Sequence, residues 1–202
     1  SAVAIVLAQN EAAFVAVPGT LFIASLWSKR LRRITIPAAL VIAAVILAVP
    51  AIRTPVVQKL TLQDYSGQVR ITQWQETIEL LKDKPIFGAG INGYPTALVP
   101  YHTHPEFEIF QYPHTILLNV WVELGLLGLI AFALLAWNTI KQGHAMTGSG
   151  NLLRLAALFA LIEMVIHGLV DVPYFKNDLA VLFWILVGFA MLHDLDKSRK
   201  LT

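Results

Sequence analysis

Histidine and glutamate side chains gather in the stretch YHTHPEFEIFQYPHT, residues 101–115, which holds three of the six histidines of the chain. His102, His104, Glu106 and Glu108 occupy alternate positions, and side chains of these types can bind zinc. Their spacing matches no standard zinc motif, and prolines lie within and beside the stretch. We therefore expect an exposed loop that binds no metal, with His102 and His104 as solvated residues.

His114 is the candidate for proton transfer, because imidazole can accept or donate a proton near neutral pH. It precedes a long apolar segment. If that segment is one helix turning about 100° per residue, Trp121, Gly125 and Gly128 share the face of His114. Small residues on a membrane helix let a neighbouring helix approach closely. We therefore expect His114 at the outer mouth of a packed groove; the alternative is an interfacial polar residue without a catalytic role.

Ionisable residues also lie inside two apolar segments. Glu163, His167 and Asp171 are spaced four residues apart and form one stripe, and Glu123 is expected on the side of its helix opposite to His114. Ionisable residues within a membrane are costly and usually face a bundle interior or a cavity. The stripe therefore predicts either polar contacts between helices or the proton relay of a transporter.

Gly88, Gly90 and Gly93 have the spacing G-x-G-x-x-G of a dinucleotide-binding turn. That turn requires a strand before the first glycine and a helix after the last, within a βαβ unit. Here a helical pattern precedes the glycines and prolines follow them, without any βαβ pattern. We expect the glycines to shape a tight loop and to bind no nucleotide.

The elements that must position these residues are apolar helices. Hydrophobic residues make up 56% of the 202 residues and charged residues 14%, against about a quarter in soluble domains. A helix needs roughly 20 apolar residues to cross the hydrocarbon core, which predicts an all-α integral membrane protein with about five transmembrane helices. The net charge of +2 and the lack of a basic stripe argue against a nucleic-acid partner, and the chain has no cysteine. The apolar blocks are Ala2–Trp27, Ile34–Ile52, Thr115–Ile140, Leu152–Val170 and Leu179–Leu192.

Basic residues predict the orientation, because they are enriched in cytoplasmic loops. The cluster SKRLRR places the turn between the first two blocks inside, so residues 53–113 form one large outer loop. The predicted parts are two membrane helices in residues 1–52, the loop in 53–113, and three membrane helices with a basic cytoplasmic tail in 114–202. Within the loop, QVRITQWQETIELLKD predicts an amphipathic helix, capped by Ser66 and ended near Pro85, with Arg70 and Trp74 on one flank.

Together these motifs resemble the O-antigen ligase and O-antigen polymerase superfamily, over most of residues 66–190. His114 and Thr115 are followed by nine residues and then by G-x-x-G at Gly125 and Gly128, although the family often has Asn, Ser or Gln where Thr115 stands. The outer-loop run of Arg, Trp, Pro and G-x-G is matched by Arg70, Trp74, Pro85 and residues 88–90. The stretch from Asp171 to Asp178 is similar to late turns of the family.

The resemblance implies part of a glycosyltransferase-C-like bundle in the bacterial inner membrane, with the active site on the periplasmic face. It implies inverting transfer of a glycan from an undecaprenyl-diphosphate carrier to a lipid or glycan acceptor, without a metal or other cofactor. Arg70 would hold the diphosphate and His114 would serve the acceptor or the leaving group, with Trp74 beside Arg70 as a further substrate contact. Asn10 would be a further substrate contact, standing where ligases commonly have a second arginine and able to form hydrogen bonds but without a charge.

Members of that superfamily are about twice this long, so we expect the chain to be the C-terminal half of a longer protein. A ligase, a repeat-unit polymerase and a protein O-glycosylating enzyme of the same superfamily all fit these motifs. From another class, the stripe of Glu163, His167 and Asp171 leaves open a polytopic transporter.

Overall fold

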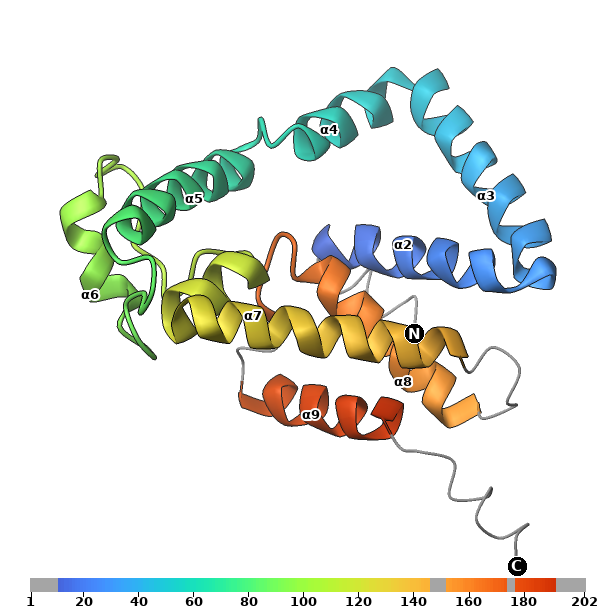
Figure 1. Ribbon diagram of the computed structural model, residues 1–202. Coiled ribbons are helices and arrows are strands. Elements are labelled where there is room, and N and C mark those ends of the chain that lie inside the picture. The colour runs from blue at the N-terminus through green and yellow to red at the C-terminus, as the bar shows by residue number, and fades with distance from the viewer. Residues whose placement is uncertain (1–10, 146–151, 174–176, 192–202) are drawn as a thin grey trace, which may run out of the picture.

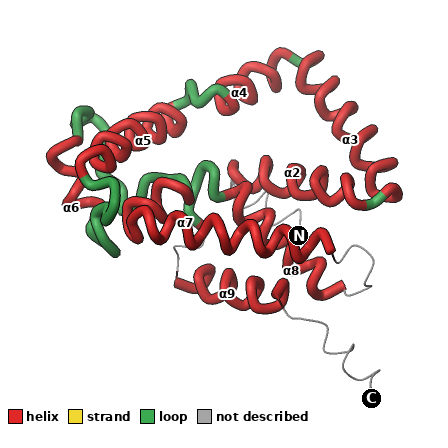
Figure 2. Tube along the Cα trace, viewed as in Figure 1, coloured by secondary structure: helices red, strands yellow, loops and turns green. Residues whose placement is uncertain are grey.

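The computed structural model describes residues 11–145, 152–173 and 177–191, and within them every regular element is a helix, as the sequence predicts (Figures 1 and 2). Asn10, the basic tail and part of the stretch from Asp171 to Asp178 lie outside these residues. The helices are α2 (Glu11–Trp27), α3 (Lys29–Ala48), α4 (Pro50–Leu60), α5 (Tyr65–Asp83), α6 (Tyr94–Leu98), a 3₁₀ turn η1 (Val99–Tyr101), α7 (Ile116–Ala145), α8 (Leu152–His167) and α9 (Asn177–Met191).

Two of the described helices are long and apolar enough to cross a membrane, namely Lys29–Ala48 and Ile116–Lys141. Val15–Leu26 and Leu179–Met191 are apolar but shorter. Helix α3 buries none of its side chains within the protein. The structure is thus that of a helical membrane protein, whereas the count of five spanning helices stays a prediction.

The SKRLRR cluster is not a turn. Ser28 caps α3 by accepting a hydrogen bond from the Leu31 backbone N–H at 3.3 Å, so the basic residues from Lys29 onward form the first turns of that helix. Arg32 reaches back and donates to the Leu26 carbonyl at 2.6 Å, at the end of α2. A serine side chain at this position satisfies a backbone donor that the helix itself leaves unpaired, which explains why α3 begins so early.

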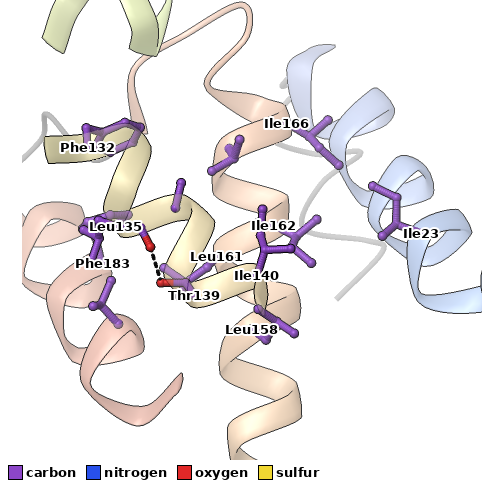
Figure 3. A pocket seen from close by; sticks show the side chains of 13 residues that line it. Ile23, Phe132, Leu135, Thr139, Ile140, Leu158, Leu161, Ile162, Ile166 and Phe183 are labelled. Carbon is purple, nitrogen blue, oxygen red and sulfur yellow. Dashed lines mark hydrogen bonds between the residues drawn. The ribbon is translucent and has the colours of Figure 1, made fainter. Parts of the chain in front are cut away.

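Helices α2, α7, α8 and α9 form the apolar bundle, in which α8 packs against both α2 and α9 (Figure 1). They line a half-open cavity of about 290 Å³ (Figure 3). Its lining is apolar apart from Thr139, whose hydroxyl donates to the Leu135 carbonyl at 2.8 Å. The cavity therefore offers no group for acid–base chemistry. The core beside it consists of Ala157, Leu161, Met164, Phe183, Val187 and Ala190.

Helix α7 is two helical segments that meet at Gly125, where φ is 69° and ψ is −172°. A straight helix from Ile116 to Thr139 would be about 35 Å long. Yet both ends of this stretch lie beside α8. The Ile116 N–H donates to the Gly168 carbonyl, and Thr139 lines the cavity together with Leu158. Gly168 and Leu158 are ten residues apart, which is only about 15 Å along a helix. The segments therefore cannot be collinear. The second one runs from Leu126 to Ala145 and is apolar over its first 15 residues, up to Ile140, about 22 Å of helix.

The predicted helix is confirmed as α5, which begins at Tyr65 and ends just before Lys84 and Pro85, but the predicted apolar face is wrong: Ile78 is 45% exposed, and the buried face carries polar Gln73 and Glu76 instead. The predicted cap at Ser66 is wrong: the Asp64 carboxylate accepts from the Gly67 N–H at 3.1 Å. A carboxylate there also interacts favourably with the helix dipole. The buried face of α5 packs on α6 and on the first segment of α7, through Leu80, Leu81, Tyr94, Leu98 and Val122.

Candidate active site

Arg70 and His114 meet at the turn that follows α8. The Arg70 Nε donates to the Val170 carbonyl at 3.0 Å. The His114 Nδ1 lies 3.6 Å from Oδ1 of Asp171, the next residue along the chain. All four residues are partly buried. Folding thus brings the two predicted catalytic residues to two neighbouring residues, Val170 and Asp171, in the turn after α8.

His114 is not on the helix, contrary to the prediction that it shares a face with Gly125 and Gly128. It precedes α7 and has a φ of 44°, in the left-handed region that few residues other than glycine adopt. The break at Gly125 also separates the predicted face into two. Backbone conformations of this kind cost about 1–3 kcal/mol and persist where neighbouring contacts impose them, often at functional sites.

Aromatic residues impose the position of His114. The Trp74 indole N–H donates to the carbonyl of Pro113 at 2.8 Å. The rings of Phe110 and Tyr112 lie edge-on to the imidazole, with centroids 5.0 Å and 4.9 Å away. Trp74, which the resemblance places beside the substrate, therefore holds the backbone just before the histidine.

The predicted stripe of Glu163, His167 and Asp171 lies beside His114. The His167 Nε2 lies 4.0 Å from Oδ2 of Asp171, and its Nδ1 lies 3.6 Å from Oε1 of Glu163. Although α8 ends at His167, the Asp171 N–H still bonds to the His167 carbonyl, which keeps the helical spacing. Burial raises the pKa of Tyr112, and the nearby Asp171 carboxylate raises it further. We call Arg70, Tyr112, His114, Glu163, His167 and Asp171 the polar cluster.

The polar cluster has the parts that acyl- or glycosyl-type transfer to a hydroxyl requires. The guanidinium of Arg70 uses Nε for Val170 and has two further nitrogens that can donate to phosphate oxygens. A carboxylate beside Nδ1 of His114 favours the tautomer whose Nε2 can accept a proton. Charge on a leaving diphosphate needs such a fixed cation, which is electrostatic stabilisation.

The glycine-rich loop after α5 docks on the break in α7. The Ala89 N–H donates to the Val122 carbonyl at 2.6 Å, and the Leu126 N–H donates to the Ile86 carbonyl at 2.9 Å. Gly88 has a φ of 65°, and a Cβ on it would collide with the Val122 carbonyl. A Cβ on Gly125 would likewise collide with the Ile86 carbonyl. The expectation that Gly88, Gly90 and Gly93 shape a tight loop is confirmed.

Glu123 serves that loop and does not stand alone in the bilayer. Its Oε1 accepts from the Asn92 N–H at 3.2 Å, and the side chain is buried. The prediction that Glu123 lies opposite to His114 assumed one continuous helix. The break at Gly125 and the start of α7 after His114 both contradict that assumption.

His102 is not a solvated residue, contrary to the sequence-based prediction. Its Nδ1 lies 3.1 Å from Oε2 of Glu76, which is 4% exposed. The other oxygen of Glu76 accepts from the backbone N–H and the hydroxyl of Thr103, at 2.8 Å and 3.2 Å. His104 is exposed, and among the described residues its ring nitrogens contact only the exposed Glu106. Sequence could have suggested this buried acid, because Glu76 lies on the face of α5 that carries Thr72 and Leu80.

Across residues 11–145, 152–173 and 177–191, no group of three or more His, Asp or Glu side chains is arranged to hold a metal ion. Asn10, the predicted counterpart of a second arginine, lies outside those ranges. A family model described as O-antigen ligase matches residues 1–133, which include Arg70, Trp74, His114 and both glycines of G-x-x-G. No curated protein and no solved structure matches the chain.

Proposed function

Because the chain belongs to the O-antigen ligase family, we propose that it transfers an oligo- or polysaccharide from an undecaprenyl-diphosphate carrier to an acceptor. The observation that carries this proposal is the meeting of Arg70 and His114 at Val170 and Asp171. Transfer takes place on the periplasmic face of the bacterial inner membrane. In that setting residues 53–113 form the periplasmic part, and about five helices span the membrane.

Arg70 holds the donor. Its guanidinium is permanently charged and planar, which suits two parallel hydrogen bonds to phosphate oxygens. The bond from Nε to Val170 fixes the plane of the group before any donor arrives. A fixed cation costs no reorganisation when charge develops on the leaving diphosphate, so it stabilises the transition state more than water would.

His114 activates the acceptor, and Asp171 positions it. The acceptor hydroxyl attacks the anomeric carbon of the donor sugar and forms the new carbon–oxygen bond, with inversion. The bond from that carbon to the diphosphate oxygen breaks, and undecaprenyl diphosphate leaves with the bonding electron pair. Nε2 of His114 takes the hydroxyl proton, and the neighbouring carboxylate of Asp171 stabilises the resulting imidazolium.

A transporter gains no support from the fold. The stripe that suggested one, Glu163, His167 and Asp171, ends beside His114 in the polar cluster. Repeat-unit polymerisation uses the same donor and the same two roles, with a glycan as acceptor, and is the alternative within the family.

The test is disruption of the full-length gene followed by analysis of lipid-linked and surface glycans. Loss of surface glycan with accumulated long lipid-linked polymer supports the ligase. Accumulated single repeat units would assign the polymerase instead. Unchanged glycans on both the carrier and the surface would contradict glycan transfer altogether.

A further inference from the structure

An apolar tip projects from the loop between α5 and α6, which lies beside α7 (Figure 1). Ile86, Phe87 and Ile91 are 56%, 83% and 78% exposed. The sequence from Pro85 to Tyr101 contains no charged residue. Exposed apolar patches of this kind usually mark a surface that contacts a membrane or another molecule.

The tip is held in place and is not a loose loop. Besides the two backbone bonds to Val122 and Leu126, the Trp121 indole N–H donates to the Pro85 carbonyl at 2.8 Å. The Asn92 N–H donates to Glu123 at the other end of the loop. The backbone is thus fixed on α7 while the apolar side chains point away from protein.

The tip continues the apolar surface of the membrane helix. Leu124 and Leu127, on either side of Gly125, are 53% and 76% exposed. After Gly125 the apolar stretch from Leu126 to Ile140 would be about 22 Å long as a helix, most of the roughly 30 Å of hydrocarbon, so Gly125 and the loop docked on it lie toward the outer side of the bilayer. Trp121 adds an amphipathic ring, of the type that is enriched at this depth, and the exposed Lys84 adds a cation for lipid phosphates.

We propose that the tip, residues 86–91, inserts into the outer leaflet of the membrane as an anchor. The partner is the lipid surface itself, reached by Phe87 and Ile91 at the level of the acyl-chain boundary. Since the same loop follows directly from α5, the anchor fixes the height of α5 above the bilayer. This inference concerns the placement of the outer region and holds whether or not the glycan-transfer proposal does.

The test uses single cysteines, because residues 1–202 contain none; any cysteine elsewhere in the full-length protein is first replaced by serine. Phe87→Cys and Ile91→Cys in the full-length protein are labelled with an environment-sensitive fluorophore and reconstituted in phosphatidylethanolamine–phosphatidylglycerol vesicles. Glu108→Cys, at an exposed charged position of the outer loop, is the matched control. Quenching is measured with nitroxide lipids and with iodide in the water, and circular dichroism verifies that each variant is folded.

We expect nitroxide lipids to quench both tip labels several times more strongly than the Glu108→Cys label, with the reverse order for iodide. Tip labels quenched by iodide as strongly as the control would overturn the anchor. Tip labels shielded from both quenchers would also overturn it, since a protein surface and not lipid would then cover the tip. Two independent tip positions prevent one misfolded variant from deciding the result.

Discussion

His114 and Asp171 face each other where the start of α7 meets the end of α8, with Nδ1 of the imidazole 3.6 Å from Oδ1 of the carboxylate. The Ile116 N–H bonds to the Gly168 carbonyl at 2.7 Å just beneath them, so a main-chain contact sets their separation. The separation of the pair is therefore set by the packing of α7 against α8. His114 is the first residue to test.

His114→Ala removes the proposed proton acceptor. Loss of a general base costs typically about 10²–10⁴ in rate, so glycan transfer by the full-length protein should fall by that order. His104→Ala is the matched control, because His104 is exposed and contacts only the exposed Glu106 among described ion-pair partners. Equal activity of the two variants at matched expression would remove His114 from the mechanism.

Arg70→Lys keeps the positive charge but loses the planar fork and the Nε bond to Val170. Loss of a charge-assisted hydrogen bond of about 1.5–3 kcal/mol lowers kcat/KM for the lipid-linked donor about 10- to 100-fold. Arg53→Lys, at an exposed position on α4, should leave it unchanged. Full donor affinity in Arg70→Lys would argue that the guanidinium only supports the turn at Val170.

His102→Ala takes one partner from the buried Glu76 carboxylate. Leaving a buried charged group short of a hydrogen bond costs about 1–3 kcal/mol, so the free energy of unfolding should fall by that amount. Surface substitutions such as His104→Ala usually stay within about 0.5 kcal/mol. Thermal unfolding of the reconstituted protein compares the two, and equal midpoints would show that the contact with Glu76 contributes nothing.

Gly88→Ala should loosen the loop from α7, because the new Cβ meets the Val122 carbonyl and φ is 65°. The strained backbone alone costs about 1–3 kcal/mol. Gly188→Ala on α9 is the counterpart, since a Cβ there meets no heavy atom within 4 Å outside its own helix backbone, and helix propensity predicts a gain of roughly 0.5–1 kcal/mol. We expect the unfolding temperature to fall for Gly88→Ala and to rise for Gly188→Ala. An unchanged unfolding temperature in Gly88→Ala would contradict the close contact between the loop and α7.

Tyr94 makes the outer region sensitive to alkali. It is fully buried, its hydroxyl lies 2.8 Å from that of Thr77, and burial raises its pKa far above the ordinary value of about 10. The unfolded chain therefore loses the phenolic proton first as pH rises. The stabilisation is complete below about pH 10 and is lost as pH climbs toward the folded pKa. Tyr94→Phe should flatten this alkaline fall in unfolding temperature; an unchanged slope would exclude Tyr94 as its source.

The sequence alone determined the helical class of the chain and the long helices, but not the short helices α4 and α6. Hydrophobic blocks and the charge deficit predict membrane helices, the helical pattern of QVRITQWQETIELLKD predicts α5, and the missing strand makes Gly88 and Gly90 a structural loop. These predictions succeed because periodicity and backbone freedom are local properties, which a residue expresses wherever its segment is placed. The motif spacing around His114 likewise pointed to the family that matches.

Only the tertiary structure decided which residues meet. Arg70 reaches Val170, His114 reaches Asp171, and His102 reaches Glu76, each through contacts between elements far apart in sequence. A helical wheel specifies which side chains share a face, but not which neighbour that face meets, nor whether the helix continues. The break at Gly125 is set by the approach of Ile86 from another element, and no periodicity within α7 encodes it. Packing between helices therefore assembled the polar cluster from parts that the sequence presents separately.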